Sequence, residues 1–264
     1  MLNFVFFKKK ELSIPSTLSN LKKSKKIQLL SPEKFFSLSQ EEKQKVKGIL
    51  ILGGDGTFLR AVPLAYEYGL PLIGINKGKF GFLTENYLEN LEKILELLEK
   101  EKLVLEERTA LKISYKNQKF IALNEGVVCR NCPEKLVYLE IKIDSFPLTV
   151  VYGDGIIVAT PTGSTAYNVS AGGSIIHPKA PVLSITPICA FKLNMKPLII
   201  PDSSSIEITV KTRTKNISLI IDGQRSISIE PFVPISFCKA EKTIKLVPAL
   251  DKAYYQILKE KFNW

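Results

Sequence analysis

The sequence predicts an α+β protein of two domains, an N-terminal Rossmann-like α/β domain at residues 1–103 and a C-terminal antiparallel β-sandwich at 104–249. The first observation is length, because 264 residues exceed most single domains. The second is that strand-like and helix-like segments alternate up to residue 103, which is typical of a parallel sheet with right-handed crossovers. The third is a series of short strands and turns after Leu103, spaced by roughly ten residues, which indicates a sandwich.

The first domain is expected to contain alternating strands and helices. Apolar runs predict strands at 2–7, 27–30, 48–54 and 70–76. Helical periodicity and polar residues at the helix starts predict helices at 15–26, 39–47, 57–68 and 86–102. In the third strand every position from Ile49 to Leu52 is apolar, as expected of a parallel strand that is buried on both faces.

Capping residues support two of these helices. Ser39 and Glu42 form a capping box at the start of the second helix, and Asn86 with Glu89 forms another at the start of the last. Pro63 is expected to interrupt the third helix, because proline lacks the amide hydrogen that a helix interior requires. The apolar face of the last helix consists of Leu88, Leu91, Leu95 and Leu98.

The second domain is expected to contain hairpins. Apolar and polar residues alternate on either side of "KNQK" (116–119), "DSFP" (144–147) and the "DG" of "IIDGQ" (220–224), and each of these is a turn signal. The final segment, at about 250–264, is typical of a helix, which we expect to pack back on the first domain.

Charge and hydropathy restrict the classes of partner and location. Lys and Arg (37) exceed Asp and Glu (26), and the net charge of +11 favours nucleotides, nucleic acid or acidic membrane surfaces as partners. The lysine runs near the N-terminus also fit a solvated face. No apolar run approaches the ~18 residues of a transmembrane helix, and the apolar stretch at the N-terminus is too short for a signal peptide. The sequence therefore predicts a cytoplasmic protein.

The cysteines suit a reducing compartment. Four are present, without the pattern of a disulfide framework. Cys129 and Cys132 form one C-x-x-C, but a zinc site would need a second pair or a nearby histidine. Since His177 is the sole histidine, we expect these cysteines to be structural and no metal to be held by a protein cluster.

The stretch "GGDGTF" (53–58) places a carboxylate among glycines where a strand gives way to a helix. Such a turn lets backbone amides approach phosphate oxygens, and the helix start adds partial positive charge. The candidate phosphate contacts here are Gly53, Gly54, Gly56 and Thr57. Neither the P-loop nor the dinucleotide fingerprint is present, so a plain structural turn is the alternative. Beside phosphate, Asp55 would be repelled unless it binds Mg²⁺ or takes a proton from an attacking hydroxyl.

A second glycine-rich stretch is "GDGIIVATPTGSTAYNVSAGG" (153–173). A strand enters a loop rich in hydroxyls and glycine, followed by a helix that begins near Ser164 or Thr165. We interpret the loop as a second anion cradle, with Gly163 and Ser164 as phosphate contacts and without a lysine of its own.

The stretch "LNEGVV" (123–128) carries polar residues inside a strand-like run. Burying the glutamate would be costly unless it were paired or bound to something. Asn124 and Glu125 together could grip ribose hydroxyls, whereas strict alternation would make Glu125 face the surface.

Five stretches follow one another along the chain: "GGDGTFLR", "LNEGVV", "GDGIIVATPTGSTAYNVSAGG", "HPKAPVLSITPIC" and "IDGQ". In this order they make the chain resemble the NAD kinase family from about residue 48 to 225. The resemblance implies Mg²⁺-dependent transfer of phosphate from ATP or polyphosphate to the adenosine-ribose 2′-hydroxyl of NAD, giving NADP. It also implies an α/β domain followed by a β-sandwich, a homodimer or homotetramer, and no nucleic-acid or membrane partner.

The resemblance assigns roles to single residues. It implies that Asp55 is the general base, that Asn124 and Glu125 hold ribose, and that Asp154 meets a polar edge of a base or carboxamide. The other NAD contacts that it implies are Gly56, Arg60, Lys135, Thr162, Thr165, Ala166, Tyr167, Asn168, Val169, Ser170 and Gln224. The chain departs from the family pattern at Tyr152, where some relatives carry arginine, and at Ala190-Phe191, where Pro-His is frequent.

Two other functions stay open at this point. A lipid or sphingoid kinase could share "GGDGT" but would be expected to lack "TPTGSTAYNVSAGG". A basic nucleic-acid-binding protein fits the charge, although no basic-aromatic motif is present. The sequence does not choose between ATP and polyphosphate, NAD and NADH, or dimer and tetramer, and it says nothing of feedback by NADP or NADPH.

Overall fold

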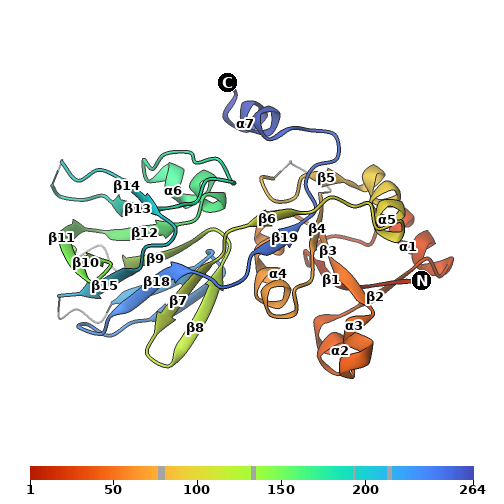
Figure 1. Ribbon diagram of the computed structural model, residues 1–264, viewed down its shortest axis with the longest axis horizontal. Helices are drawn as coiled ribbons and strands as arrows, with labels where there is room; N and C mark the ends of the chain where they lie inside the picture. The colour runs from red at the N-terminus through yellow and green to blue at the C-terminus, as the bar shows by residue number, and fades with distance from the viewer. Residues whose placement is uncertain (77–80, 132–134, 193, 213–215) are drawn as a thin grey trace. The chain divides into compact units, whose positions relative to one another are not determined.

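A computed structural model of the protein describes residues 1–76, 81–131, 135–192, 194–212 and 216–264 (Figure 1). The chain divides into two compact units, of which the first comprises Met1–Glu107 with Lys245–Trp264 and the second comprises Arg108–Ile244. Within the described residues, we find no helix with the length and apolar character needed to cross a membrane.

The first unit is built on a seven-stranded sheet with the strand order β2-β1-β3-β4-β19-β6, and β5 pairs with β4. The strands are β1 (Leu2–Lys8), β2 (Ile27–Leu30), β3 (Val46–Leu52), β4 (Leu72–Asn76), β5 (Asn86–Tyr87), β6 (Glu106–Arg108) and β19 (Ile244–Leu246). The pairings from β2 to β19 and that of β5 with β4 are parallel. Because β19 lies far along the chain, its place beside β4 could not be predicted from local patterns.

The first unit contains six α-helices within the described residues. They are α1 (Ser16–Lys23), α2 (Pro32–Phe36), α3 (Gln40–Gln44), α4 (Asp55–Tyr68), α5 (Leu91–Glu99) and α7 (Tyr254–Phe262), with a 3₁₀ turn at Leu88–Asn90. Leu91, Ile94 and Leu95 of α5 join one core cluster with sheet residues such as Leu50 and Ile73. The capping box of Ser39 and Glu42 at the start of α3 is confirmed.

Two predictions for this unit are wrong. The helix expected at 86–102 begins only at Leu91, and the Asn86 amide forms no cap: it donates to the carbonyl of Pro248 (3.0 Å) and accepts from the amide of Leu250 (3.1 Å). Hydrogen bonds to a segment distant in the sequence therefore take the place of the predicted helix cap. Helix α4 also continues through Pro63, because its buried face holds both sides of the proline in place.

The second unit contains two six-stranded sheets, ordered β11-β10-β15-β18-β7-β8 and β14-β13-β12-β9-β16-β17. The first sheet comprises β7 (Leu111–Tyr115), β8 (Gln118–Ala122), β10 (Val137–Ile143), β11 (Phe146–Gly153), β15 (Ile206–Val210) and β18 (Ile235–Lys239). The second comprises β9 (Glu125–Arg130), β12 (Gly155–Ala159), β13 (Val182–Ile188), β14 (Leu198–Pro201), β16 (Ile217–Ile221) and β17 (Arg225–Ser228). The three predicted hairpins are confirmed as β7–β8, β10–β11 and β16–β17.

One apolar core joins the two sheets, with Ile113 and Phe237 from the first and Val128 and Leu219 from the second. This packing defines an antiparallel sandwich. Gly126 lies at a close approach, because a Cβ there would come within 2.6 Å of Ile113 Cδ1 and 2.7 Å of Phe237 Cε1. The glycine that follows Glu125 in "LNEG" therefore allows β9 to pack against the opposite sheet.

Candidate active site

In the first unit, Asp55 is the first residue of α4, directly after the glycines that follow β3. Its carboxylate does not face the amides of its own turn. It accepts hydrogen bonds from the backbone amides of Phe82 (2.9 Å, to Oδ2), Leu83 and Thr84 (both 3.1 Å, to Oδ1), and from the Thr84 hydroxyl (3.2 Å, to Oδ1). Because the carboxyl ends of parallel strands share one edge of a sheet, the chain after β4 meets the turn after β3.

These bonds leave the two carboxylate oxygens unequal. Oδ1 accepts three hydrogen bonds and Oδ2 accepts one, so Oδ2 retains a lone-pair site for another donor. Gly81 has no alternative at its position, since a Cβ there would lie 2.0 Å from Asp55 Oδ1. The loop 81–84 is thus part of the site, although the sequence analysis passed over it; the glycine just before Phe82 was its only local signal.

The other residues of the glycine turn divide between packing and exposure. A Cβ on Gly53 would come within 2.8 Å of Thr57 Oγ1, so this glycine allows the turn to close on a buried threonine. Gly54 has open space around it and Gly56 is exposed. The first-turn amides of a helix lack intrahelical acceptors, and this open start of α4 suits an anion. Arg60 is exposed, with Nη2 3.4 Å from the carbonyl of Lys8.

In the second unit, Asp222 clamps the segment that carries Asn124 and Glu125. Its buried carboxylate accepts from the amides of Leu123 (2.8 Å), Asn124 (2.8 Å) and Glu125 (3.1 Å). Asp222 and Gly223 have φ values of 49° and 62°, the left-handed conformation that a two-residue hairpin turn requires. The "DG" of "IIDGQ" therefore makes the predicted turn and also a clamp that was not predicted.

Glu125 faces inward, so the surface-facing alternative is wrong. The side chain is buried, and its Oε2 has no hydrogen-bond partner among the described residues. Burial, and secondly the nearby Asp222 charge, raise the pKa of Glu125 to about 8. Burial likewise raises the pKa of Asp222 to about 6, against the lowering effect of its three amide bonds. Near neutral pH Glu125 is therefore mostly a neutral acid, which presents one O–H donor as well as acceptor sites.

The hydroxyl-rich loop packs directly on this segment. The Thr160 amide donates to the Asn124 carbonyl (2.8 Å), and a Cβ on Gly163 would lie 2.1 Å from the same oxygen. Thr162, between them, is buried with a hydroxyl that has no partner among the described residues. Buried polar atoms without partners are rare, and Glu125 and Thr162 each carry one on adjoining segments. This pair marks a place for a polar ligand.

Two of the predicted contact residues form hydrogen bonds to other residues of the protein. The Ser164 hydroxyl donates to the Pro161 carbonyl (2.6 Å) and accepts from the Ile176 amide (2.9 Å). The Asn168 amide donates to the Ser174 carbonyl (3.1 Å) and accepts from the Thr186 hydroxyl (2.6 Å). Both side chains are fully buried, so they shape the loop rather than offer atoms to a ligand. A 3₁₀ turn (Thr162–Thr165) and the short α6 (Tyr167–Ser170) replace the predicted helix.

The remaining predicted residues of the second unit differ in exposure and partners. Asp154 forms an ion pair with Arg130 (2.7 Å), a partner that the sequence analysis missed. Tyr167 is exposed, and partial burial raises its pKa, with smaller contributions from Cys129, Cys189 and Asp154. The exposed members of the predicted set are Lys135, Ser170 and Gln224, and the partly buried ones are Thr165, Ala166 and Val169.

The two departures from the family pattern are in contact. The rings of Tyr152 and Phe191 meet edge-on with centroids 5.7 Å apart, and Tyr138 stacks on Tyr152 at 4.3 Å. Aromatic packing therefore occupies both positions at which the sequence departs from the family pattern.

No group of three or more His, Cys, Asp or Glu side chains that could hold a metal ion occurs in the described ranges. Cys129 is a free, half-buried thiol, and Cys132 lies outside the described residues. The structural role of the C-x-x-C stays a prediction.

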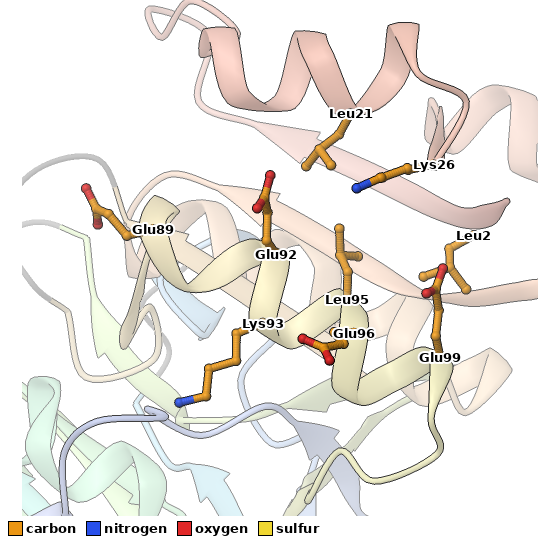
Figure 2. A pocket seen from close by; sticks show the side chains of 9 residues that line it. All are labelled: Leu2, Leu21, Lys26, Glu89, Glu92, Lys93, Leu95, Glu96 and Glu99. Carbon is orange, nitrogen blue, oxygen red and sulfur yellow. The ribbon is translucent and has the colours of Figure 1, made fainter.

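A cavity of about 530 Å³ in the first unit contains none of the predicted site residues. Figure 2 shows Glu92 and Leu95 of α5 facing Leu21 and Lys26 across it. Its lining includes four glutamates and two lysines, and this excess of acid disfavours a nucleotide phosphate.

Both parts of the chain match one family. Residues 8–103 match the ATP-NAD kinase N-terminal domain, and residues 123–249 match the ATP-NAD kinase C-terminal domain. The NAD kinase of Sulfurimonas denitrificans is 36% identical over 220 residues, which are 82% of this chain and 77% of the relative. The NAD kinase of Methanothermobacter thermautotrophicus is 38% identical over 213 residues, 81% of this chain and 75% of the relative.

Solved structures share the fold. An NAD kinase from Archaeoglobus fulgidus in complex with ATP is 26% identical, with a TM-score of 0.79 over 99% of each chain. Yeast NADH kinase complexed with NADH has a TM-score of 0.87 over 100% of this chain and 88% of the other, and at 24% identity it supports the fold alone. The predicted fold class is confirmed.

The raised pKa of Glu125 predicts a pH-dependent stability. A carboxyl whose folded pKa exceeds its unfolded value stabilises the fold fully at low pH and loses that contribution as pH rises, here between about 4.5 and about 8. Urea unfolding of the wild type should show the free energy of unfolding falling across this window, by on the order of a few kcal/mol. Glu125→Gln, which cannot ionise, should lose the slope between about pH 6 and about pH 8, a range that lies above the raised pKa of Asp222. Parallel curves for the two proteins would contradict this description of Glu125.

Proposed function

The chain belongs to the NAD kinase family, and from this premise we propose that it transfers the γ-phosphoryl group of ATP to the adenosine-ribose 2′-hydroxyl of NAD, giving NADP and ADP. One observation carries the proposed mechanism. The Asp55 carboxylate is held rigidly by three amides while Oδ2 keeps a lone-pair site. Family membership favours this reaction over the lipid-kinase and nucleic-acid alternatives.

Asp55 acts as the general base in this proposal. A neutral ribose hydroxyl is a weak nucleophile, and its proton must leave as its oxygen bonds to phosphorus. The proton passes to Asp55 Oδ2, the new O–P bond forms at the 2′-oxygen, and the bond from phosphorus to the leaving oxygen of ADP breaks. The amides of residues 82–84 fix the carboxylate, so the base needs no reorientation during the step.

The donor phosphates suit the start of α4. The open glycine turn and the positive end of the helix provide amides for phosphate oxygens. A divalent cation bound with the nucleotide would neutralise part of the phosphate charge. Polyphosphate as a donor and a cytoplasmic location stay predictions of the sequence.

The ribose of NAD suits the segment clamped by Asp222. A ribose diol both donates and accepts hydrogen bonds, and Glu125 Oε2 and Thr162 Oγ1, which lack partners among the described residues, would take part in both. Asn124 lies next to Glu125 on the same clamped turn. The site would therefore satisfy these buried atoms with ligand hydroxyls, which removes the cost of leaving them unpaired.

Replacing the base should separate catalysis from binding. Asp55→Asn keeps the shape but cannot take the proton, so the rate of NADP formation with NAD, ATP and Mg²⁺ should fall at least ~10²-fold while NAD affinity is nearly unchanged. Asp251→Asn, an exposed aspartate of the same unit, is the control and should match the wild type. An unchanged rate for Asp55→Asn would remove Asp55 from its role.

The ribose contact is tested by Glu125→Ala. Loss of a buried hydrogen-bonding partner should weaken NAD binding by about tenfold or more in titration calorimetry. Glu241→Ala changes an exposed glutamate in the same unit and should leave the affinity unaltered. Equal affinities for Glu125→Ala and the wild type would show that ribose binds elsewhere.

We also propose that the chain forms a homodimer or homotetramer through β11. This strand lies at one end of its sheet and exposes 78% of Phe146, 49% of Leu148 and 41% of Val150, whereas exposed edge strands are normally polar. Light scattering should give the mass of two or four chains, and Leu148→Lys should shift it toward one. Gln118→Lys on β8, at the opposite edge, should not. A wild-type mass of one chain would rule this interface out.

A further inference from the structure

Helix α7 lies outside both family matches, which end at residues 103 and 249. Its last turn nevertheless packs on the loop that holds Asp55. The rings of Phe262 and Phe82 are 5.7 Å apart, and the Lys261 ammonium is 5.9 Å from the centre of the Phe82 ring. The amide of Phe82 is the donor to Asp55 Oδ2 (2.9 Å). The C-terminal helix therefore brings a cation to the loop that holds the carboxylate proposed as the base.

The charges around Lys261 define its electrostatic setting. Its ammonium interacts with the Asp55 carboxylate, with Glu260 and with Lys252, and Lys252 is itself paired with Glu260 at 2.6 Å. Burial lowers the pKa of Lys261, the two carboxylates partly oppose this, and Lys252 adds to the lowering. Lys261 thus loses its proton more readily than a fully exposed lysine would.

The glycine motif that would bind donor phosphate contains no cation itself, and Arg60, further along the same helix, is directed to the carbonyl of Lys8 (3.4 Å). A P-loop carries a lysine at the end of its glycine motif, and "GGDGTF" has an aspartate but no lysine. Phosphoryl transfer places growing negative charge on the equatorial oxygens beside an ionised base, and it depends largely on positioning and charge stabilisation. A cation next to Asp55 would meet that need.

We propose that Lys261 is a further catalytic residue, whose ammonium contacts the phosphoryl group in transit from donor to acceptor. The inference rests on the proposed function with Asp55 as base. The acceptor oxygen must lie within hydrogen-bond reach of Asp55 Oδ2, and the phosphorus bonds to that oxygen. A cation beside the carboxylate therefore faces the oxygens on which charge develops.

Three variants on one helix test this. Lys261→Met should lower kcat for NADP formation by about 10²-fold, the scale seen when one transition-state donor is lost, with KM for NAD within about twofold of the wild type. Lys259→Met removes an exposed lysine of the same helix and should leave kcat unchanged. Lys261→Arg keeps the charge and should retain more than a tenth of the wild-type kcat.

The pH profile distinguishes a catalytic charge from a structural one. As pH rises, Lys261 loses its charge and kcat should fall, whereas arginine stays charged, so the alkaline limb of Lys261→Arg should move to higher pH. This comparison of pH profiles remains informative even if Lys261→Met fails to fold.

A wild-type kcat in folded Lys261→Met, or superimposable alkaline limbs for Lys261→Arg and the wild type, would overturn the inference. If Lys261→Met is active and Asp55→Asn is not, only this inference fails; if the wild type makes no NADP, the proposed function fails.

Discussion

One interaction recurs in both units of the protein: a single carboxylate binds three consecutive backbone amides. Asp55 binds the amides of residues 82–84, and Asp222 binds those of residues 123–125. Three successive amides that point one way cannot all find partners in a regular strand. Each would cost about 1–3 kcal/mol if buried without a partner, and a carboxylate is the compact acceptor that serves all three. The geometry of each loop depends on this bond set.

Exposure decides what each carboxylate does beyond holding its loop. Asp222 is buried and acts on its neighbour through charge, helping to keep a proton on Glu125. Asp55 is half-buried and keeps a lone-pair site on Oδ2, so it is available to a substrate proton. The same bond set thus produces a clamp in one unit and holds the proposed base in the other.

The polar residues of the hydroxyl-rich loop differ in their hydrogen bonding, which composition does not reveal. Ser164 and Asn168 bond to neighbouring backbone and side chains, and these bonds fix the loop. Thr162, on the same loop, is left with a buried hydroxyl and no partner among the described residues. Polar residues in one motif therefore differ in function because only some of them find partners within the fold.

The sequence by itself determined the features that depend on neighbours in the chain. The capping box at Ser39 and the three hairpins were predicted because their signals span only a few residues. The glycine turn with Asp55 and the segment with Glu125 were also found from local residue type. Tertiary structure alone decided that Asn86 bonds to residue 248, that the Glu125 side chain is buried and its amide bonds to Asp222, and that the end of α7 packs on the loop that holds Asp55. In each case the partner is roughly a hundred residues or more along the chain, and local patterns carry no information about which distant strand or helix will be adjacent.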